Sequence, residues 1–229
     1  MRIFLSLAAI AAFALLGACN VVMTKDPLFT QKDAAGAPVL KPGVWLFFED
    51  PGCKVDESRP FTEWPDCAGG GVVGADDISG PKSKEAKDQI EHMPYVLTAG
   101  SPRILQIPVD IGVSAQATAS ASGDAQVTTS PPSSTELKPY GYGGVEPVKF
   151  DDQGRIVAFT LWPVQCGPPP PKNDSAFVTH HPLPGLTVEK DGGICTTAST
   201  AALRNAAKAS RAWAGDMLRA SHWIRDGNR

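Results

Sequence analysis

Arg155 to Val164 reads RIVAFTLWPV, and the rest of the chain has to be built around this run. Apolar or small side chains occupy both sets of alternating positions, which predicts a strand that is covered on both faces and lies inside a sheet rather than at its edge. Val145 to Phe150 precedes it as a second candidate strand. Asp151-Asp152-Gln153-Gly154 lies between the two, and Gly154 can take the positive φ that such a turn requires. The stretch therefore predicts an antiparallel hairpin.

Further short apolar runs, each bounded by turn residues, extend the predicted sheet. They are Val44 to Phe48, Tyr95 to Thr98, Arg103 to Val109, Leu186 to Lys190, Gly193 to Thr196, and Ser221 to Arg225. Strands that are close in sequence should pair, and the Asp191-Gly192 dipeptide is among the best two-residue hairpin turns. By count of these runs, we expect a mainly antiparallel sheet of roughly six to nine strands.

The strongest helix signal is Thr197 to Trp213, TASTAALRNAAKASRAW. Alanine has the highest helix propensity, and Thr197, Ser199 or Thr200 can cap the N-terminus. The packing stripe is narrow and made mostly of small residues, so the helix can lie close on a sheet. The stripe consists of Leu203, Ala206, Ala207, Ser210, Trp213 and Ala214. Sheet and helix together predict an α+β fold with a C-terminal Ala-rich helix.

Two stretches before Pro94 carry weaker signals. Gly69 to Gly74 has the letters G-x-G-x-x-G, but it lacks the strand before it and the helix after it that a dinucleotide site needs. We therefore interpret it as a loop that enters a short strand. Lys82 to Met93 spaces its apolar residues at helical intervals, which predicts a short amphipathic helix.

The N-terminus has the layout of a secretory signal. Met1-Arg2 is a short basic start, an apolar run from Ile3 to Leu16 follows, and Leu16-Gly17-Ala18-Cys19 closes it. This stretch resembles the signal peptide and lipobox of bacterial lipoproteins, and the resemblance implies cleavage before Cys19 and a lipid on its thiol. The alternatives are an ordinary secretory signal cut after Ala18 and a transmembrane anchor, although the apolar run is shorter than the ~20 residues that a span needs.

The resemblance to lipoproteins also implies a location, whereas the remaining chain resembles no family that we recognise. Acyl chains on Cys19 hold a protein at a bilayer, since each buried methylene contributes ~0.8 kcal/mol. Asn20 is not the aspartate that retains many lipoproteins at the inner membrane, which favours the periplasmic face of an outer membrane. We thus expect a signal peptide over 1–18, the lipidated cysteine and a flexible tether over 19–41, and one α+β domain over 42–229 with a low-complexity loop at about 113–136.

Four cysteines remain once Cys19 carries lipid: Cys53, Cys67, Cys166 and Cys195. An even number of cysteines in an exported chain predicts disulfides. Four cysteines allow three connectivities, and we favour Cys53 with Cys67 and Cys166 with Cys195, because short loops close at low entropic cost. Structural zinc is disfavoured, because no two of these cysteines lie two to four residues apart.

The polar loop from Cys53 to Cys67 contains two aromatic residues, Phe61 and Trp64. One interpretation is a recognition loop that presents Trp64 to a ligand. The simpler one is a disulfide-bonded connector whose aromatic side chains fill the edge of the core, which is the commoner role of single aromatics in small exported domains.

Composition and motifs exclude several kinds of function. The 229 residues carry 21 basic and 24 acidic side chains, for a net charge of −3, so nothing suggests a nucleic-acid binder. His180 and His181 are adjacent, and adjacent residues of an extended chain point in opposite directions, so one ion cannot easily bind both. We therefore expect no metal and no cofactor, and the sequence assigns no catalytic residue.

One basic row remains as a candidate site. Arg204, Lys208 and Arg211 follow each other at steps of four and three, so they line one face of the expected helix. The row is either a contact for an anionic envelope component, such as lipid phosphate or wall polymer, or a solvated helix face. The sequence thus predicts a membrane-anchored periplasmic lipoprotein that binds or scaffolds. The alternative is a cell-envelope hydrolase whose carboxylates are scattered in sequence but gathered in space.

Overall fold

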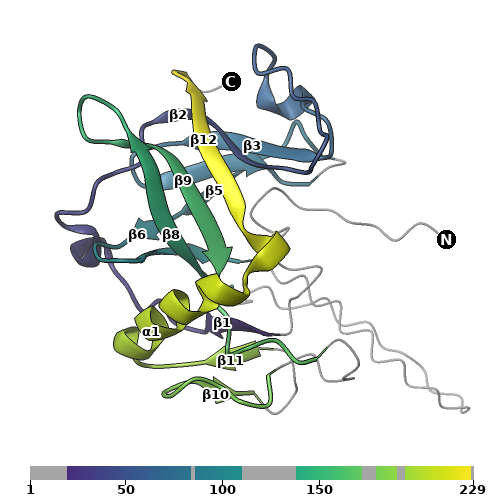
Figure 1. Cartoon of the computed structure of the whole chain (residues 1–229). Helices are drawn as coiled ribbons and strands as arrows, with labels where there is room; N and C mark the ends of the chain where they lie inside the picture. Colours follow the sequence, from purple (N-terminus) through teal and green to yellow (C-terminus); the bar gives the residue numbers. More distant parts are fainter. Residues whose placement is uncertain (1–19, 84–85, 110–137, 172–178, 190–193, 228–229) are drawn as a thin grey trace, which may run out of the picture.

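The computed structural model describes residues 20–83, 86–109, 138–171, 179–189 and 194–227. These residues form a mostly antiparallel sheet of 12 strands with an α-helix packed against it (Figure 1). The strands are β1 (Val21–Thr24), β2 (Gly43–Glu49), β3 (Ala68–Val73), β4 (Asp77–Pro81), β5 (Ile90–Pro94), β6 (Val96–Leu97), β7 (Arg103–Pro108), β8 (Tyr140–Phe150), β9 (Ile156–Pro163), β10 (Thr187–Val188), β11 (Ile194–Thr196) and β12 (Arg219–Arg225). The helix is α1 (Thr200–Ser210), and the 3₁₀ turns are η3 (Gln31–Ala34), η4 (Phe61–Glu63), η5 (Arg211–Trp213) and η6 (Gly215–Met217). The predicted α+β class is confirmed.

The β8–β9 hairpin lies at the centre of this sheet. The strand order is β10-β11-β1-β8-β9-β12-β2-β3-β4-β5, with β7 also beside β8 and β6 beside β7. The hairpin turn is closed by Asp151, whose Oδ1 accepts hydrogen bonds from the backbone N–H groups of Gln153 and Arg155. Gly154 has a φ of 73°, as the turn requires. Since β9 pairs with β8 on one side and β12 on the other, the prediction of an inner strand is confirmed.

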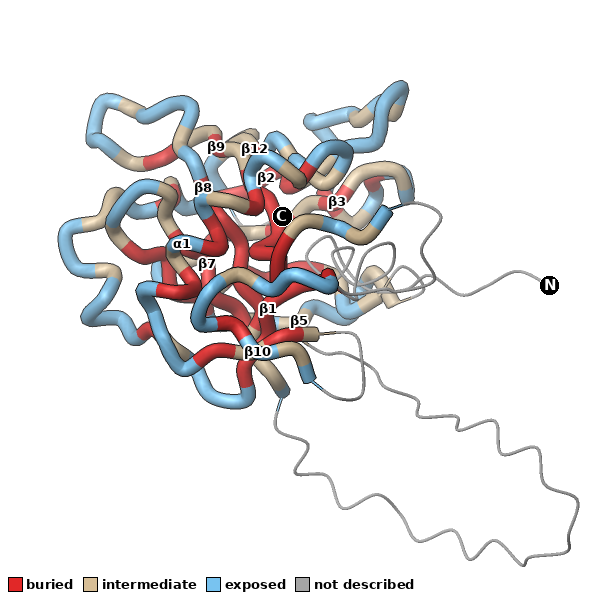
Figure 2. Tube along the Cα trace, turned by 60° about the horizontal axis from the view of Figure 1, so that its bottom comes forward, coloured by how far each residue is buried: buried red, intermediate tan, exposed pale blue. Residues whose placement is uncertain are grey.

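Apolar residues cover both faces of β9, and Figure 2 shows the buried chain gathered under β1, β2 and β7. On one face, Phe159 lies 5.3 Å from Trp45 of β2, measured between ring centroids. On the other face, Trp162 is buried and donates its indole N–H to the carbonyl of Ala207 in α1, at 2.8 Å. Ile156, Phe159 and Leu161 of β9 belong to one core cluster, and Val164, directly after the strand, belongs to a second cluster that includes the buried face of α1.

Helix α1 forms as its sequence predicts. Ser199 is the N-cap, and its hydroxyl accepts a hydrogen bond from the backbone N–H of Ala202. Leu203, Ala206 and Ala207 are fully buried against the sheet. Because these residues are mostly alanine, the helix axis comes close enough for Ser210 to donate to a carbonyl of its own helix and accept from the backbone N–H of Gln165 in the strand segment.

Both predicted disulfides are confirmed: Cys53 bonds to Cys67 and Cys166 bonds to Cys195. The first closes the loop that carries Phe61 and Trp64, and both aromatic side chains are buried against β2 and β3. The interpretation of that loop as a connector that fills the core edge is therefore confirmed. The second disulfide lies in the core between the sheet and α1.

The predicted flexible tether over 19–41 is wrong for the residues that the structure describes. Residues 21–24 form β1, which is buried throughout and pairs with both β8 and β11. Phe29 and Leu40 are also buried. The strand could not be predicted from the sequence because it is only four residues long. Its partner strands come more than a hundred residues later in the chain, so no local pattern indicates the pairing.

The predicted helix over 82–93 is also wrong. Ile90–Pro94 forms β5, which pairs with β4 along its whole length, while the residues before it turn without forming a helix in the part that is described. The glycines at 69–74 lie mostly within strand β3 rather than in a loop before it. They are needed there because a Cβ at Gly70 would come within 2.4 Å of the Trp64 ring. Strand β10 pairs with β11 as predicted, whereas the Asp191-Gly192 turn and the low-complexity stretch at 113–136 lie outside the described residues.

Candidate functional site

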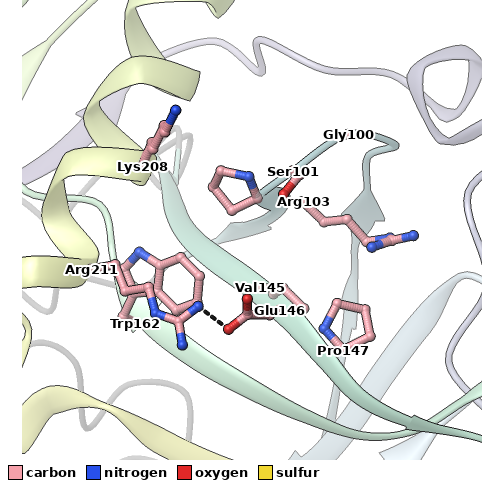
Figure 3. A pocket seen from close by; sticks show the side chains of 10 residues that line it. Gly100, Ser101, Arg103, Val145, Glu146, Pro147, Trp162, Lys208 and Arg211 are labelled. Carbon is pink, nitrogen blue, oxygen red and sulfur yellow. Dashed lines mark hydrogen bonds and ion pairs between the residues drawn. The ribbon is translucent and has the colours of Figure 1, made fainter.

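A pocket of about 150 Å³ lies where α1 and η5 meet the sheet. Four segments form it: the turn between β6 and β7 with the start of β7, the middle of β8, the end of β9, and the last turn of α1 with the start of η5. The lining residues are Gly100, Ser101, Pro102, Arg103, Val145, Glu146, Pro147, Trp162, Lys208 and Arg211. Figure 3 shows these side chains around the opening.

Trp162 gives the pocket a rigid base. Its indole lies over Gly144 of the neighbouring strand, where a Cβ would come within 2.3 Å of the ring. Only glycine therefore lets the indole lie flat across β8 at this point. The hydrogen bond from its Nε1–H to Ala207 ties the ring to α1, so strand and helix hold the pocket in one shape.

The charge in the pocket is mainly positive: Arg103, Lys208 and Arg211 against Glu146. Arg211 stacks over the Trp162 ring, with the guanidinium carbon 5.2 Å from the ring centroid, and makes an ion pair with Glu146 (Figure 3). The two paired side chains are 46% and 50% exposed. An ion pair this exposed is worth only about 0–1 kcal/mol, so an incoming anion can displace Glu146 from Arg211 at low cost.

Arg103 is the residue of this pocket that sequence reasoning missed. It starts β7 and pairs with Val145, which places it at the rim beside Glu146 and Pro147. Figure 3 shows its guanidinium extending past Pro147, on the opposite side of the opening from Lys208. Its Nε is buried and has no hydrogen-bond partner among the described residues. No local signal could have found it, because its proximity to α1 depends on how β7, β8 and the helix assemble.

The structure divides the predicted basic row. Lys208 and Arg211 line the pocket, whereas Arg204 turns to the other side of the Gly100 turn. There the guanidinium of Arg204 donates to the carbonyl of Ala99 at 2.8 Å and lies over the ring of Phe29, 5.2 Å from its centroid. Arg204 therefore holds the turn between β6 and β7 against α1, and two of the three predicted residues belong to the site.

Neither a carboxylate pair nor a metal cluster stands out in this site. Glu146 is the one acidic residue among those that line the pocket, so a carboxylate-based hydrolase finds no acid–base pair there. In the part of the chain that the structure describes, no group of three or more His, Cys, Asp or Glu side chains is arranged to hold a metal. His181 is exposed on the loop that follows Thr179.

In comparisons with known proteins, no family model, no curated protein and no solved structure matches the chain. The longest helix among the described residues, α1, has 11 residues, and no helix in those ranges has the length and apolar character needed to cross a bilayer.

Proposed function

We propose that this protein is a lipoprotein of the cell envelope, attached through lipid on Cys19 to the periplasmic face of an outer membrane, and that it binds an anionic group of the envelope. The group would be a phosphate ester of a lipid headgroup or of a wall polymer. The observation that carries this proposal is that three basic residues, Lys208, Arg211 and Arg103, line one pocket, in which Arg211 lies over the Trp162 ring.

The chemistry of the lining residues suits a phosphate. The planar guanidinium of Arg211 can donate two parallel hydrogen bonds to phosphate oxygens, while the ammonium of Lys208 supplies a mobile point charge. The indole beneath Arg211 is a low-dielectric wall, which strengthens the attraction between its guanidinium and an anion. Three cations against one carboxylate leave a surplus of positive charge for a ligand.

The lipid anchor is supported by the sequence from Met1 to Cys19 and by the state of the other cysteines. All four pair in disulfides, which is the arrangement expected of a protein that matures in an oxidising compartment such as a periplasm. An anchored binding protein needs no catalytic group, and the pocket offers positive charge and shape rather than a nucleophile beside a base.

The test uses the mature chain with Cys19→Ser, so that lipid on the protein does not itself cause membrane binding. Flotation with vesicles of phosphatidylcholine alone, or mixed with phosphatidylglycerol, measures the affinity at several salt concentrations. Each basic residue near an anionic surface contributes about 1 kcal/mol. We therefore expect the double variant Lys208→Gln/Arg211→Gln to bind the anionic vesicles roughly 30-fold more weakly than the parent, since about 2 kcal/mol corresponds to that factor.

The matched control is Lys54→Gln/Lys149→Gln, which removes the same charge from exposed positions outside the pocket. This control should retain most of the binding, and inorganic phosphate should compete with the vesicles for the parent protein. An equal loss in both double variants would show that net charge alone attracts the protein, and it would contradict a specific pocket.

A further inference from the structure

Asn20, the residue directly after the proposed lipid-bearing cysteine, is held inside the fold. Its side-chain amide donates to the carbonyl of Gly167 at 2.9 Å, and its side-chain carbonyl accepts from the backbone N–H of Thr179 at 3.0 Å. Its own backbone carbonyl accepts from the N–H of Cys166 at 2.8 Å. Its side-chain amide also donates to the side-chain carbonyl of Gln165 at 3.4 Å. With four hydrogen bonds to two separate segments and 6% of its surface exposed, Asn20 cannot act as part of a linker.

The residues that follow Asn20 are held as firmly. Strand β1 begins at Val21, and the N–H of Val22 donates to the carbonyl of Val164 at 2.8 Å. The disulfide between Cys166 and Cys195 lies against the same strand, since the Sγ of Cys166 is 3.4 Å from the carbonyl of Val21. The chain thus enters the core at its first described residue.

We infer that the protein sits directly on the bilayer, with the surface around Pro169 and His181 against the lipid headgroups. This inference rests on the lipid anchor of the proposed function. Consecutive Cα atoms are about 3.8 Å apart, so a lipid on Cys19 is attached one residue from the packed domain. A flexible tether of about twenty residues would instead let the domain move roughly 25 Å from the membrane and turn freely.

The surface next to Asn20 suits a headgroup layer. Residues 165–171 and 179–188 include no Asp, Glu, Lys or Arg. Pro169, Pro171, His181 and Pro182 are exposed there. These two described stretches therefore bring no carboxylate toward anionic headgroups and no lysine or arginine that would have to lose its water. These stretches therefore add no repulsion between like charges when they approach the bilayer.

The opposite end of the molecule is the tip of the β8–β9 hairpin. The chain runs from the tip at Gly154 through β9 to Gln165, which lies beside Asn20. At about 3.3 Å per residue, Gly154 and Gln165 are on the order of 30 Å apart. Figure 1 shows the hairpin loop far from β1, at the other end of the sheet. A protein seated as we infer holds this tip, with Asp151 and Asp152, away from the membrane.

The experiment compares two labels on the lipidated full chain in vesicles. A fluorophore on His181→Cys or on Gln153→Cys reports contact with nitroxide-labelled headgroups; both positions are exposed, and mass mapping without reduction checks that the native disulfides are intact. We expect at least fivefold stronger quenching at 181 than at 153. A flexible Gly-Ser insert of twenty residues between Cys19 and Asn20 should remove most of the difference.

Flotation of the unlabelled protein separates the two proposals. If the protein floats with vesicles but quenching is equal at 181 and 153, the lipid anchor is present and the inferred orientation on the bilayer is wrong. The inferred orientation is also wrong if the ratio of quenching at 181 to quenching at 153 is the same with and without the insert. A protein that does not float, or whose mass lacks lipid, overturns the anchor and the seating together.

Discussion

The two disulfides should differ in how much they stabilise the fold. Cys53 and Cys67 are 14 residues apart, whereas Cys166 and Cys195 are 29 apart. By the loop-entropy relation, removing these cross-links costs about 3 and about 4 kcal/mol. Cys166 and Cys195 are also fully buried in the core between the sheet and α1, so replacing both by alanine leaves unfilled space that costs roughly another 1 kcal/mol. We expect the second double variant to lose about 5 kcal/mol in total.

Urea unfolding followed by tryptophan fluorescence measures this ranking in the Cys19→Ser background. The free energy of unfolding should fall by about 3 kcal/mol in Cys53→Ala/Cys67→Ala and by about 5 kcal/mol in Cys166→Ala/Cys195→Ala, with steeper denaturant slopes than the parent because the denatured chain without the cross-link is more expanded. If the second variant has no detectable folded state, the difference in urea midpoint between the parent and the first variant still measures the cost of removing the first disulfide. The complete unfolding of the second variant then shows that removing the second disulfide costs more. Equal costs, or a larger cost for the first disulfide, would refute the reasoning from loop length and burial.

Three further predictions concern single side chains. Trp162→Phe removes the hydrogen bond to the Ala207 carbonyl and part of the buried ring, so thermal unfolding should show a loss of about 2 kcal/mol. Glu146→Gln frees Arg211 from its exposed ion pair and should raise the affinity for phosphatidylglycerol vesicles roughly threefold in flotation, by the median worth of such a pair; an unchanged or lower affinity would contradict the pocket. Burial, and to a smaller extent the charges of Asp76 and Asp77, raises the pKa of Tyr95 to about 12 from its ordinary value of 10.0. The folded state therefore holds this proton more tightly, and the resulting stability is complete below about pH 10 and is lost as the pH rises toward about 12. In Tyr95→Phe this alkaline loss should shrink, as urea midpoints across that pH range would show.

The parts of the fold that could be predicted are those whose information is local. The β8–β9 hairpin carries its own turn, helix α1 its own cap and packing stripe, and each disulfide closes a short loop. In each case the deciding contacts join residues near one another in the chain, so the sequence pattern and the structural contact coincide.

The parts that could not be predicted depend on distant partners. Strand β1 pairs Val22 with Cys195, and no pattern within a four-residue segment can reveal a partner that far away. The same limit applies to the site. Helical spacing predicts that Lys208 and Arg211 lie on one face of the helix. Arg103 lines the same pocket only because β7 pairs with β8 next to the helix. The prediction of a helix over residues 82–93 is wrong for a different reason. Helical spacing of a few apolar residues stabilises a helix less than the pairing of β5 with β4 stabilises a strand.

The position of β1 links the two proposals physically. In the strand order, β1 lies between β11 and β8, so it connects the short β10–β11 hairpin to the main sheet. The disulfide from Cys166 to Cys195 makes the same connection covalently, directly beside β1. Any force on a lipid at Cys19 would therefore act on a strand that is hydrogen-bonded on both edges and braced by a disulfide, rather than on a loose terminus. A fold that holds its first strand in this way can keep one face toward the membrane and so hold the pocket at a constant orientation to it.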